Sequence, residues 1–319
     1  MRLRFPGIFL GILAVSASAS FLSAEDAPVI GALKGPSGIA LIQLFENPPR
    51  LSDGRIARME AVSSADLMVA KLVSGECQVA VLPVNMAAKL RTSGLDVTLG
   101  AITGNGMLEF LTNASDISTL ADLRGRRVDV SGQGATPEYL FRRLLRDAGL
   151  DPDKDLRLSF TLTYSEMAAA LAGGRIESAL LPEPFATLAR MKNPGLRAPF
   201  DIRDLWKAST GMPDYPMTVL VFRDGSSIPR SDARIILDAV RDSIAATVKN
   251  PVAAGVLVEK YGLGLPRAVA VAAIPRCNFV FLESKEARPE VEAILREFLS
   301  SAPDSIGGRL PDDGFYADY

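Results

Sequence analysis

Apolar residues along this chain form two alternating patterns, short unbroken runs and longer stretches with helical spacing. Largely apolar runs at 29–33, 77–82 and 177–181 are typical of strands buried in a parallel sheet. Apolar positions that recur every three or four residues predict helices, as within 67–73 and 138–148. Strands that alternate with helices in this way predict an α/β fold.

Two of the predicted helices carry clear start and stop signals. Ser63 and Ser64 precede the first of them and Gly75 follows it, while Thr136 and Pro137 open the second. A hydroxyl at a helix start accepts a hydrogen bond from an early amide, and proline has no amide hydrogen to leave unpaired. Glycine after the last turn adopts the left-handed conformation that ends many helices.

The same arrangement of elements occurs twice. Segment 76–90 (ECQVAVLPVNMAAKL) aligns without a gap with segment 175–189 (RIESALLPEPFATLA), which places Pro83 on Pro182, 99 residues later. The same separation aligns further pairs: Val29 with Val128, Gly35 with Gly134, and Gly75 with Gly174. Two copies of one α/β unit are the simplest explanation, and a duplicated unit leaves a cleft between its copies.

The segments between the copies predict a hinge. Residues 107–112 carry the chain into the second copy, and the apolar strand at 218–222 returns it to the first. We therefore expect duplicated lobes joined by a hinge of two crossings. The expected boundaries are 25–106 and 217–285 for the first lobe, 107–216 for the second, and 286–319 for a C-terminal helix and an acidic, aromatic tail.

Residues 1–24 read as a signal peptide. Arg2 and Arg4 form a basic start, residues 5–15 are apolar but too short to span a bilayer, and small residues precede Ala24. Cleavage near Ala24 would release a soluble periplasmic protein. An uncleaved membrane anchor is the alternative, although the acidic residues that follow Ala24 favour cleavage.

Charge and composition exclude several classes of function. Without the two arginines of the signal peptide, 33 basic residues face 37 acidic ones, a formal charge of −4 that argues against a nucleic-acid partner. The chain contains no histidine. Zinc sites and serine or cysteine triads that depend on imidazole are therefore not expected, and we expect no metal, no cofactor and no catalytic residue.

The two cysteines, Cys77 and Cys277, allow one disulfide in an oxidising compartment. A chain of this length buries enough surface to fold without such a bond, and an unpaired cysteine is often a small buried apolar residue. The sequence leaves both possibilities open.

The loops that follow the repeated strands are the first candidate ligand site. In α/β sheets, ligands bind beyond the carboxyl ends of the strands, where glycines permit close approach and free helix amides attract negative atoms. The candidates are Lys34, Gly35, Pro36 and Ser37 in the first copy, and Gly132, Gln133, Gly134, Ala135 and Thr136 in the second. The alternative is that both loops are ordinary strand-to-helix turns.

The Leu-Pro turns of the two copies supply a second pair of candidates. Asn85 follows Pro83 in the first copy, and Glu183 lies between two prolines in the second. Because proline stiffens a turn, both side chains project from a fixed backbone. Glu183 is suited to receive a ligand donor, or a lysine or arginine from the opposite lobe. The alternative is an exposed glutamate on a turn.

Three further residues complete the predicted site. Arg276 is a candidate anion donor, Asn278 can both donate and accept hydrogen bonds, and Met217 is a candidate for the cleft wall. Packing in the core is the alternative for Met217.

Two segments give the chain a family resemblance. The helix opening SGQGATPEY at 131–139 and, above all, LPEPF at 181–185 resemble the solute-binding proteins of ABC importers. The nearest group handles sulfonates, taurine, nitrate and pyrimidine precursors of thiamine. The resemblance implies a periplasmic-binding-protein fold (type II-like), whose lobes close on a small polar or anionic solute and present it to a membrane permease. A monomer without covalent chemistry is the corresponding expectation.

Two other functions remain open at this point. One is an enzyme on the same fold, in a thiamine-pyrimidine or menaquinone pathway, although the chain lacks the cysteine-rich motif of pyrimidine-synthesising relatives and the signal peptide argues against it. The other is an extracytoplasmic sensor that docks on a receptor. The identity of the solute is not predicted.

Overall fold

The computed structural model describes residues 27–130, 132–224, 228–316 and 319. The predicted signal peptide, residues 1–24, lies outside the described residues. Within the described ranges, no helix combines the length and the apolar character needed to cross a membrane.

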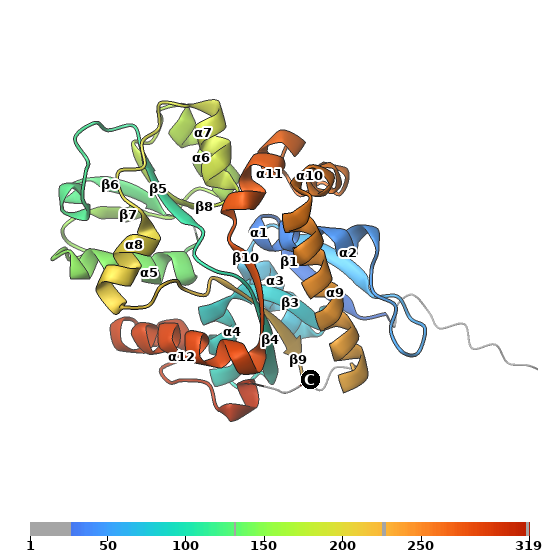
Figure 1. Ribbon diagram of the computed structural model, residues 1–319. Helices are drawn as coiled ribbons and strands as arrows, with labels where there is room; N and C mark the ends of the chain where they lie inside the picture. The colour runs from blue at the N-terminus through green and yellow to red at the C-terminus, as the bar shows by residue number, and fades with distance from the viewer. Residues whose placement is uncertain (1–26, 131, 225–227, 317–318) are drawn as a thin grey trace, which may run out of the picture.

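The first lobe is built on a six-stranded sheet with the strand order β10-β4-β9-β3-β1-β2 (Figure 1). Its strands are β1 (Val29–Leu33), β2 (Arg58–Val62), β3 (Val79–Pro83), β4 (Val97–Gly104), β9 (Thr218–Arg223) and β10 (Phe279–Glu283). β1 runs parallel to β2 and β3, whereas β9 is antiparallel to both β3 and β4. The predicted strand at 218–222 therefore does return the chain to this sheet.

The second lobe is built on a four-stranded sheet with the order β5-β8-β6-β7. Its strands are β5 (Leu108–Thr112), β6 (Arg127–Val130), β7 (Arg157–Ser159) and β8 (Ser178–Pro182). β6 is parallel to β7 and β8, as β1 is to β2 and β3, so the two lobes repeat one three-stranded arrangement. β1 and β6, the first strands of the two copies, lie in separate sheets.

The strand registers correct the gap-free alignment of the copies by one residue. Gly31 pairs with Ala80 in the first lobe, and Asp129 pairs with Ala179 in the second. Ala80 and Ala179 are 99 residues apart, but Gly31 and Asp129 are only 98 apart. The second copy thus has one residue more between β6 and its later elements, which sequence similarity alone did not reveal.

Twelve helices are described, and they cover the sheets (Figure 1). Those between the strands of the first lobe are α1 (Pro36–Ala40), α2 (Ile42–Glu46), α3 (Ala65–Ser74) and α4 (Val84–Thr92); those of the second lobe are α5 (Thr136–Asp147), α6 (Tyr164–Ala172), α7 (Phe185–Lys192) and α8 (Ile202–Thr210). After the return crossing come α9 (Arg230–Lys249), α10 (Pro251–Lys260), α11 (Arg267–Ala273) and α12 (Ser284–Ser301).

The capping predictions are confirmed for α3 but not for α5. Ser64 accepts from the amide of Leu67, and Gly75 ends the helix with φ of 83°. The residue that caps α5 is Ala135, so the prediction that the Thr136 hydroxyl accepts an amide hydrogen bond is wrong. That hydroxyl instead donates to Oδ1 of Asn85 in the first lobe.

The C-terminal segment packs against both lobes. α12 contacts α4 in the first lobe and α5 in the second (Figure 1). The ring of Tyr139 on α5 lies tilted against that of Phe298, with the centroids 6.0 Å apart, and Arg143 donates to Glu297 at 3.1 Å. The tail is anchored as well, since Phe315 is fully buried.

Candidate functional site

Glu183 is held at the point where β8 ends and α7 begins. A cis peptide bond joins it to Pro184, and its Oε2 atom accepts a 3.0 Å hydrogen bond from the amide of Thr187 in the first turn of α7. The partial positive charge at the start of a helix favours a carboxylate there. The side chain is only 1% exposed, so the alternative of an exposed glutamate on a turn is wrong.

Arg276 reaches Glu183 from the first lobe. It ends the short 3-10 helix η3 (Ile274–Arg276), two residues before β10 begins. Its Nε atom donates to Oε1 of Glu183 at 2.9 Å, and its Nη2 atom donates to Glu109 at the start of β5. A buried carboxylate is stable only when paired in this way. Of the two partners suggested for Glu183, a ligand donor or a basic side chain from the opposite lobe, the structure shows the second, Arg276.

A second arginine extends this contact into a row of alternating charges. Arg190, on α7, pairs with the other oxygen of Glu109, so the row runs Arg190, Glu109, Arg276, Glu183. Burial, and secondly the charge of Arg276, lower the pKa of Arg190 below its ordinary value. Burial and the neighbouring Glu183 raise the pKa of the Cys277 thiol.

These charges line a cavity of about 640 Å³ at the junction of the lobes. Glu109, Glu183, Arg190 and Arg276 form one wall, and residues 198–203, which lead into α8, form another. The volume falls within the roughly 300–1,000 Å³ that small-molecule sites occupy. The lobe junction is also a usual place for such a site.

Asn278 borders the same cavity and fixes the hinge backbone. Its Nδ2 atom donates to Asp214 at 2.7 Å and to the carbonyl of Gly106 at 3.2 Å. Asp214 in turn accepts from the amide of Gly106 at 2.9 Å. Asn278 therefore ties both crossings between the lobes to the strand that follows Arg276.

Asn85 forms a second bridge between the lobes. Its Nδ2 atom donates to the carbonyl of Gly134 at 2.9 Å and to that of Ser305 at 3.3 Å, and its Oδ1 atom accepts from Thr136 at 3.1 Å. Asn85 is completely buried. The structure thus brings the predicted residues Asn85, Gly134 and Thr136 together. Their polar groups form hydrogen bonds with one another.

The predicted loop at 34–37 is held by an internal hydrogen bond and packs against the second lobe. The hydroxyl of Ser37 accepts from the amide of Leu33 at 2.9 Å, which fixes the turn that contains Gly35. A side-chain carbon on Gly35 would lie 3.4 Å from the ring of Phe185, so the lobes approach closely here. The rings of Phe185 and Tyr164 are tilted against each other with their centroids 5.2 Å apart, and burial raises the pKa of that tyrosine to about 12.

The remaining predicted residues differ in how far they are buried. Lys34 and Gln133 are exposed, Pro36 and Gly132 are half-buried, and Ala135 is buried. Met217 is buried at the return crossing, where its amide donates to the carbonyl of Gly104 at 3.0 Å. It therefore belongs to the hinge and does not line the cavity described above.

Sequence reasoning missed Glu109, Arg190 and the wall at 198–203. Glu109 is the one charged residue in a strand of otherwise apolar character, and Arg190 lies seven residues after Glu183, on the helix that Glu183 begins. The sequence therefore carried a signal for each residue: a charge within an apolar strand for Glu109, and the spacing from Glu183 for Arg190.

The structure also bears on thiol and metal chemistry. Cys77 and Cys277 are both buried free thiols. Among the described residues, no group of three or more histidine, cysteine, aspartate or glutamate side chains is arranged to hold a metal ion.

The comparisons with known proteins define the family. Residues 51–247, more than half of the chain, match the model of the NMT1-like family. The chain therefore belongs to the NMT1-like family. No curated protein sequence matches it at a significant level.

Solved structures are similar to this chain over most of its length. An ABC transporter protein from Parabacteroides distasonis is 28% identical, with a TM-score of 0.74, over 92% of this chain and 99% of that one. The periplasmic aliphatic sulphonate binding protein SsuA from Escherichia coli is 18% identical, with a TM-score of 0.70, over 92% of both chains. The periplasmic nitrate-binding protein NrtA from Synechocystis PCC 6803 is 16% identical, with a TM-score of 0.64, over 88% of this chain and 84% of that one.

The last two similarities concern the fold alone. Together with the two sheets, they identify the predicted two-lobe fold of periplasmic binding proteins.

Proposed function

We propose that this protein is the extracytoplasmic solute-binding component of an ABC importer. It captures a small polar or anionic organic solute, of the sulfonate, nitrate or taurine type or a vitamin precursor, by closure of the two lobes. The observation that carries the proposal is the contact of Arg276 with Glu183 and Glu109 across the lobe junction, beside a cavity of about 640 Å³. The structural similarity to an ABC transporter protein and to sulphonate- and nitrate-binding proteins supports it.

The domain boundaries form part of the proposal. Lobes at 25–106 with 217–285 and at 107–216 put Arg276 and Glu183 on opposite sides of the hinge. Closure then assembles the row of charges, and opening separates it. Free energy that a ligand gains only in the closed form shifts the equilibrium towards closure.

The ligand-binding residues are proposed in two groups. Glu183, Arg276 and Asn278 contact the cavity directly, and the loops at 34–37 and 132–136, with Asn85, govern how closely the lobes approach. Met217 acts within the hinge. A cavity lined by both guanidinium and carboxylate groups suits solutes that carry an anionic group together with hydrogen-bond donors.

The proposal extends to partners and location. A membrane permease receives the solute, the protein acts as a monomer in the periplasm, and residues 1–24 are removed near Ala24. N-terminal sequencing of the mature protein tests the cleavage. An enzyme on the same fold is not favoured, because SsuA and NrtA, which share the fold, are binding proteins.

A thermal-shift screen tests the function. Sulfonates, nitrate, carboxylates, zwitterions and heterocycles are added in turn to the mature protein. One class should raise the melting temperature in a concentration-dependent manner, because a ligand that binds only the folded state stabilises it. No shift from any class, combined with turnover of a thiamine-pyrimidine or menaquinone precursor, would contradict the importer role.

A further inference from the structure

A recess at the outer end of the second lobe gathers four arginines. It lies where β6, β7 and β8 begin, has a volume of about 370 Å³, and is lined by Arg126, Arg127, Arg157 and Arg175. The carboxyl ends of the same strands point towards the first lobe. The recess is therefore separate from the cavity at the lobe junction.

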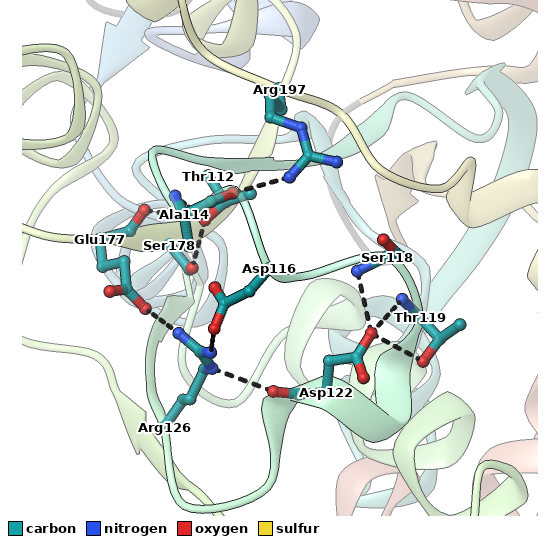
Figure 2. A network of polar contacts seen from close by, with 10 residues as sticks. All are labelled: Thr112, Ala114, Asp116, Ser118, Thr119, Asp122, Arg126, Glu177, Ser178 and Arg197. Atoms are coloured by element: carbon teal, nitrogen blue, oxygen red, sulfur yellow. Dashed lines mark hydrogen bonds and ion pairs between the residues drawn. The ribbon is translucent and has the colours of Figure 1, made fainter.

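Two of these guanidinium groups are fixed by the surrounding structure. Arg127 donates to both oxygens of the buried Asp129, at 2.7 and 3.1 Å. Arg126 donates to Glu177 at 2.9 Å, to Asp116, and to the carbonyl of Asp122 at 3.0 Å. Figure 2 shows Arg126 between the side chains of Asp116 and Glu177. Fixed guanidinium groups lose little conformational entropy on binding an anion.

The other two arginines add charge that is not balanced locally. Arg157 and Arg175 are exposed, and neither forms an ion pair within the part of the chain that the structure describes. Arg157 lies directly opposite Arg127 in the β6–β7 register.

The first lobe provides an internal comparison. The corresponding recess, of about 310 Å³, contains Arg58 and Lys71 together with Glu60 and Glu76. Lys71 pairs with Glu60 at 3.0 Å and with Glu76 at 3.1 Å, so the charges are balanced there.

The two recesses carry opposite charges at one pair of matching positions. The separation of 99 residues places Arg58 on Arg157, but it places Glu76 on Arg175. The second lobe therefore has a guanidinium where the first has a carboxylate. The ion pairs of this recess join only Arg126 and Arg127 to carboxylates, those of Asp116, Glu177 and Asp129.

We propose that this recess is a binding site for a tetrahedral oxyanion, that is, sulfate or a phosphate group. Planar guanidinium groups match the oxygens of such anions, and the recess offers two exposed ones beside two that are already oriented. The phosphate comes either from a free ion or from the headgroup of an anionic lipid. The inference does not depend on the solute that the cleft binds.

Titration calorimetry tests the site with sodium sulfate and sodium phosphate, at constant ionic strength in sodium chloride. The double variant Arg157→Gln/Arg175→Gln should bind the anion at least ~10-fold more weakly than the wild type, a change of about 1.4 kcal/mol. Arg58→Gln, at the matching position of the first lobe, should leave the affinity unchanged. An affinity that falls in Glu183→Gln, and not in the double variant, would place the anion in the cleft and overturn the proposal.

A second measurement distinguishes the two sources of phosphate. Co-sedimentation with phosphatidylglycerol vesicles, but not with phosphatidylcholine vesicles, that is lost in the double variant identifies a lipid headgroup. Calorimetric binding without co-sedimentation identifies a free ion. Equal behaviour of wild type and double variant in both assays would overturn the proposal, provided that the melting temperature in chloride shows the variant to be folded.

Discussion

Arg276 and Glu183, which belong to different lobes, are joined by a 2.9 Å hydrogen bond between Nε and Oε1. Glu183 is almost completely buried, whereas about half of the Arg276 side chain remains exposed towards the cavity. The carboxylate thus belongs to the rigid end of β8 and α7, and the guanidinium arrives from the other side of the hinge. The contact exists only when the lobes are close together.

Removing the guanidinium should favour separation of the lobes. In Arg276→Gln, Glu183 and Glu109 lose their shared cation, and a buried carboxylate without its partner is strongly destabilised unless water reaches it. Small-angle X-ray scattering of the unliganded protein should therefore give a larger radius of gyration than for wild type. Arg296→Gln, an exposed arginine on α12, is the matched control. Identical scattering of all three proteins would show that Arg276 does not hold the lobes together.

Asn85 should contribute measurably to stability. Asn85→Ala removes the acceptor of Thr136 and the donor to Gly134 and Ser305, leaving buried polar groups unpaired. The expected cost is about 1–3 kcal/mol in the free energy of unfolding, measured by urea denaturation. Asn85→Asp should cost more, because a carboxylate would face two carbonyl oxygens. Asn47→Ala, at an exposed asparagine, should change stability little, and a comparable loss there would refute the assignment.

A carboxylate at the edge of the first sheet should make stability dependent on pH. Both Nη atoms of Arg234 donate to Glu283, at 2.8 and 2.9 Å, and these hydrogen bonds lower the pKa of Glu283 below its ordinary value of 4.5. A carboxyl group whose pKa is lowered in the folded state stabilises that state above its unfolded pKa, and the contribution is lost as the pH falls through the folded value. The difference in melting temperature between wild type and Glu283→Gln should therefore shrink between pH 7 and pH 3. A constant difference would contradict this account.

The two thiols should be unreactive in the native protein. Burial raises the pKa of Cys77 to about 12 and that of Cys277 well above its ordinary value, and thiolate is the reactive form. A disulfide-exchange reagent should label the native protein very slowly, and should detect both cysteines once the protein is unfolded in denaturant. Failure to detect thiols in the unfolded, unreduced protein would mean that Cys77 and Cys277 pair after export.

The strong periodic signals were sufficient to predict most of the fold. The segments that form β1, β3 and β9 are apolar and buried over almost their whole length. Their short apolar runs therefore predicted buried strands. β2 was missed because Arg58 and Glu60 interrupt it, as expected for a strand at the edge of a sheet. α11 was missed because its sequence, RAVAVAA, has no helical spacing of polar residues.

The candidate site was predicted only in part, because its contacts join distant segments. Arg276 and Glu183 are 93 residues apart, and Asn85 is 220 residues from Ser305. The sequence pointed to Glu183 through its two flanking prolines, but the identity of its partner depends on how the lobes pack. The hydroxyl of Thr136 illustrates the same limit, since a tertiary contact replaced the local cap that the sequence favoured.

The most direct test of the central claim is the affinity of Glu183→Gln for the solute found in the thermal-shift screen. Titration calorimetry compares wild type with this variant and with Glu286→Gln, which alters an exposed glutamate on α12. Loss of a buried, charge-assisted contact should weaken binding about ten- to a hundredfold in Glu183→Gln and leave Glu286→Gln unchanged. Equal affinities in all three proteins would contradict the assignment of the cleft.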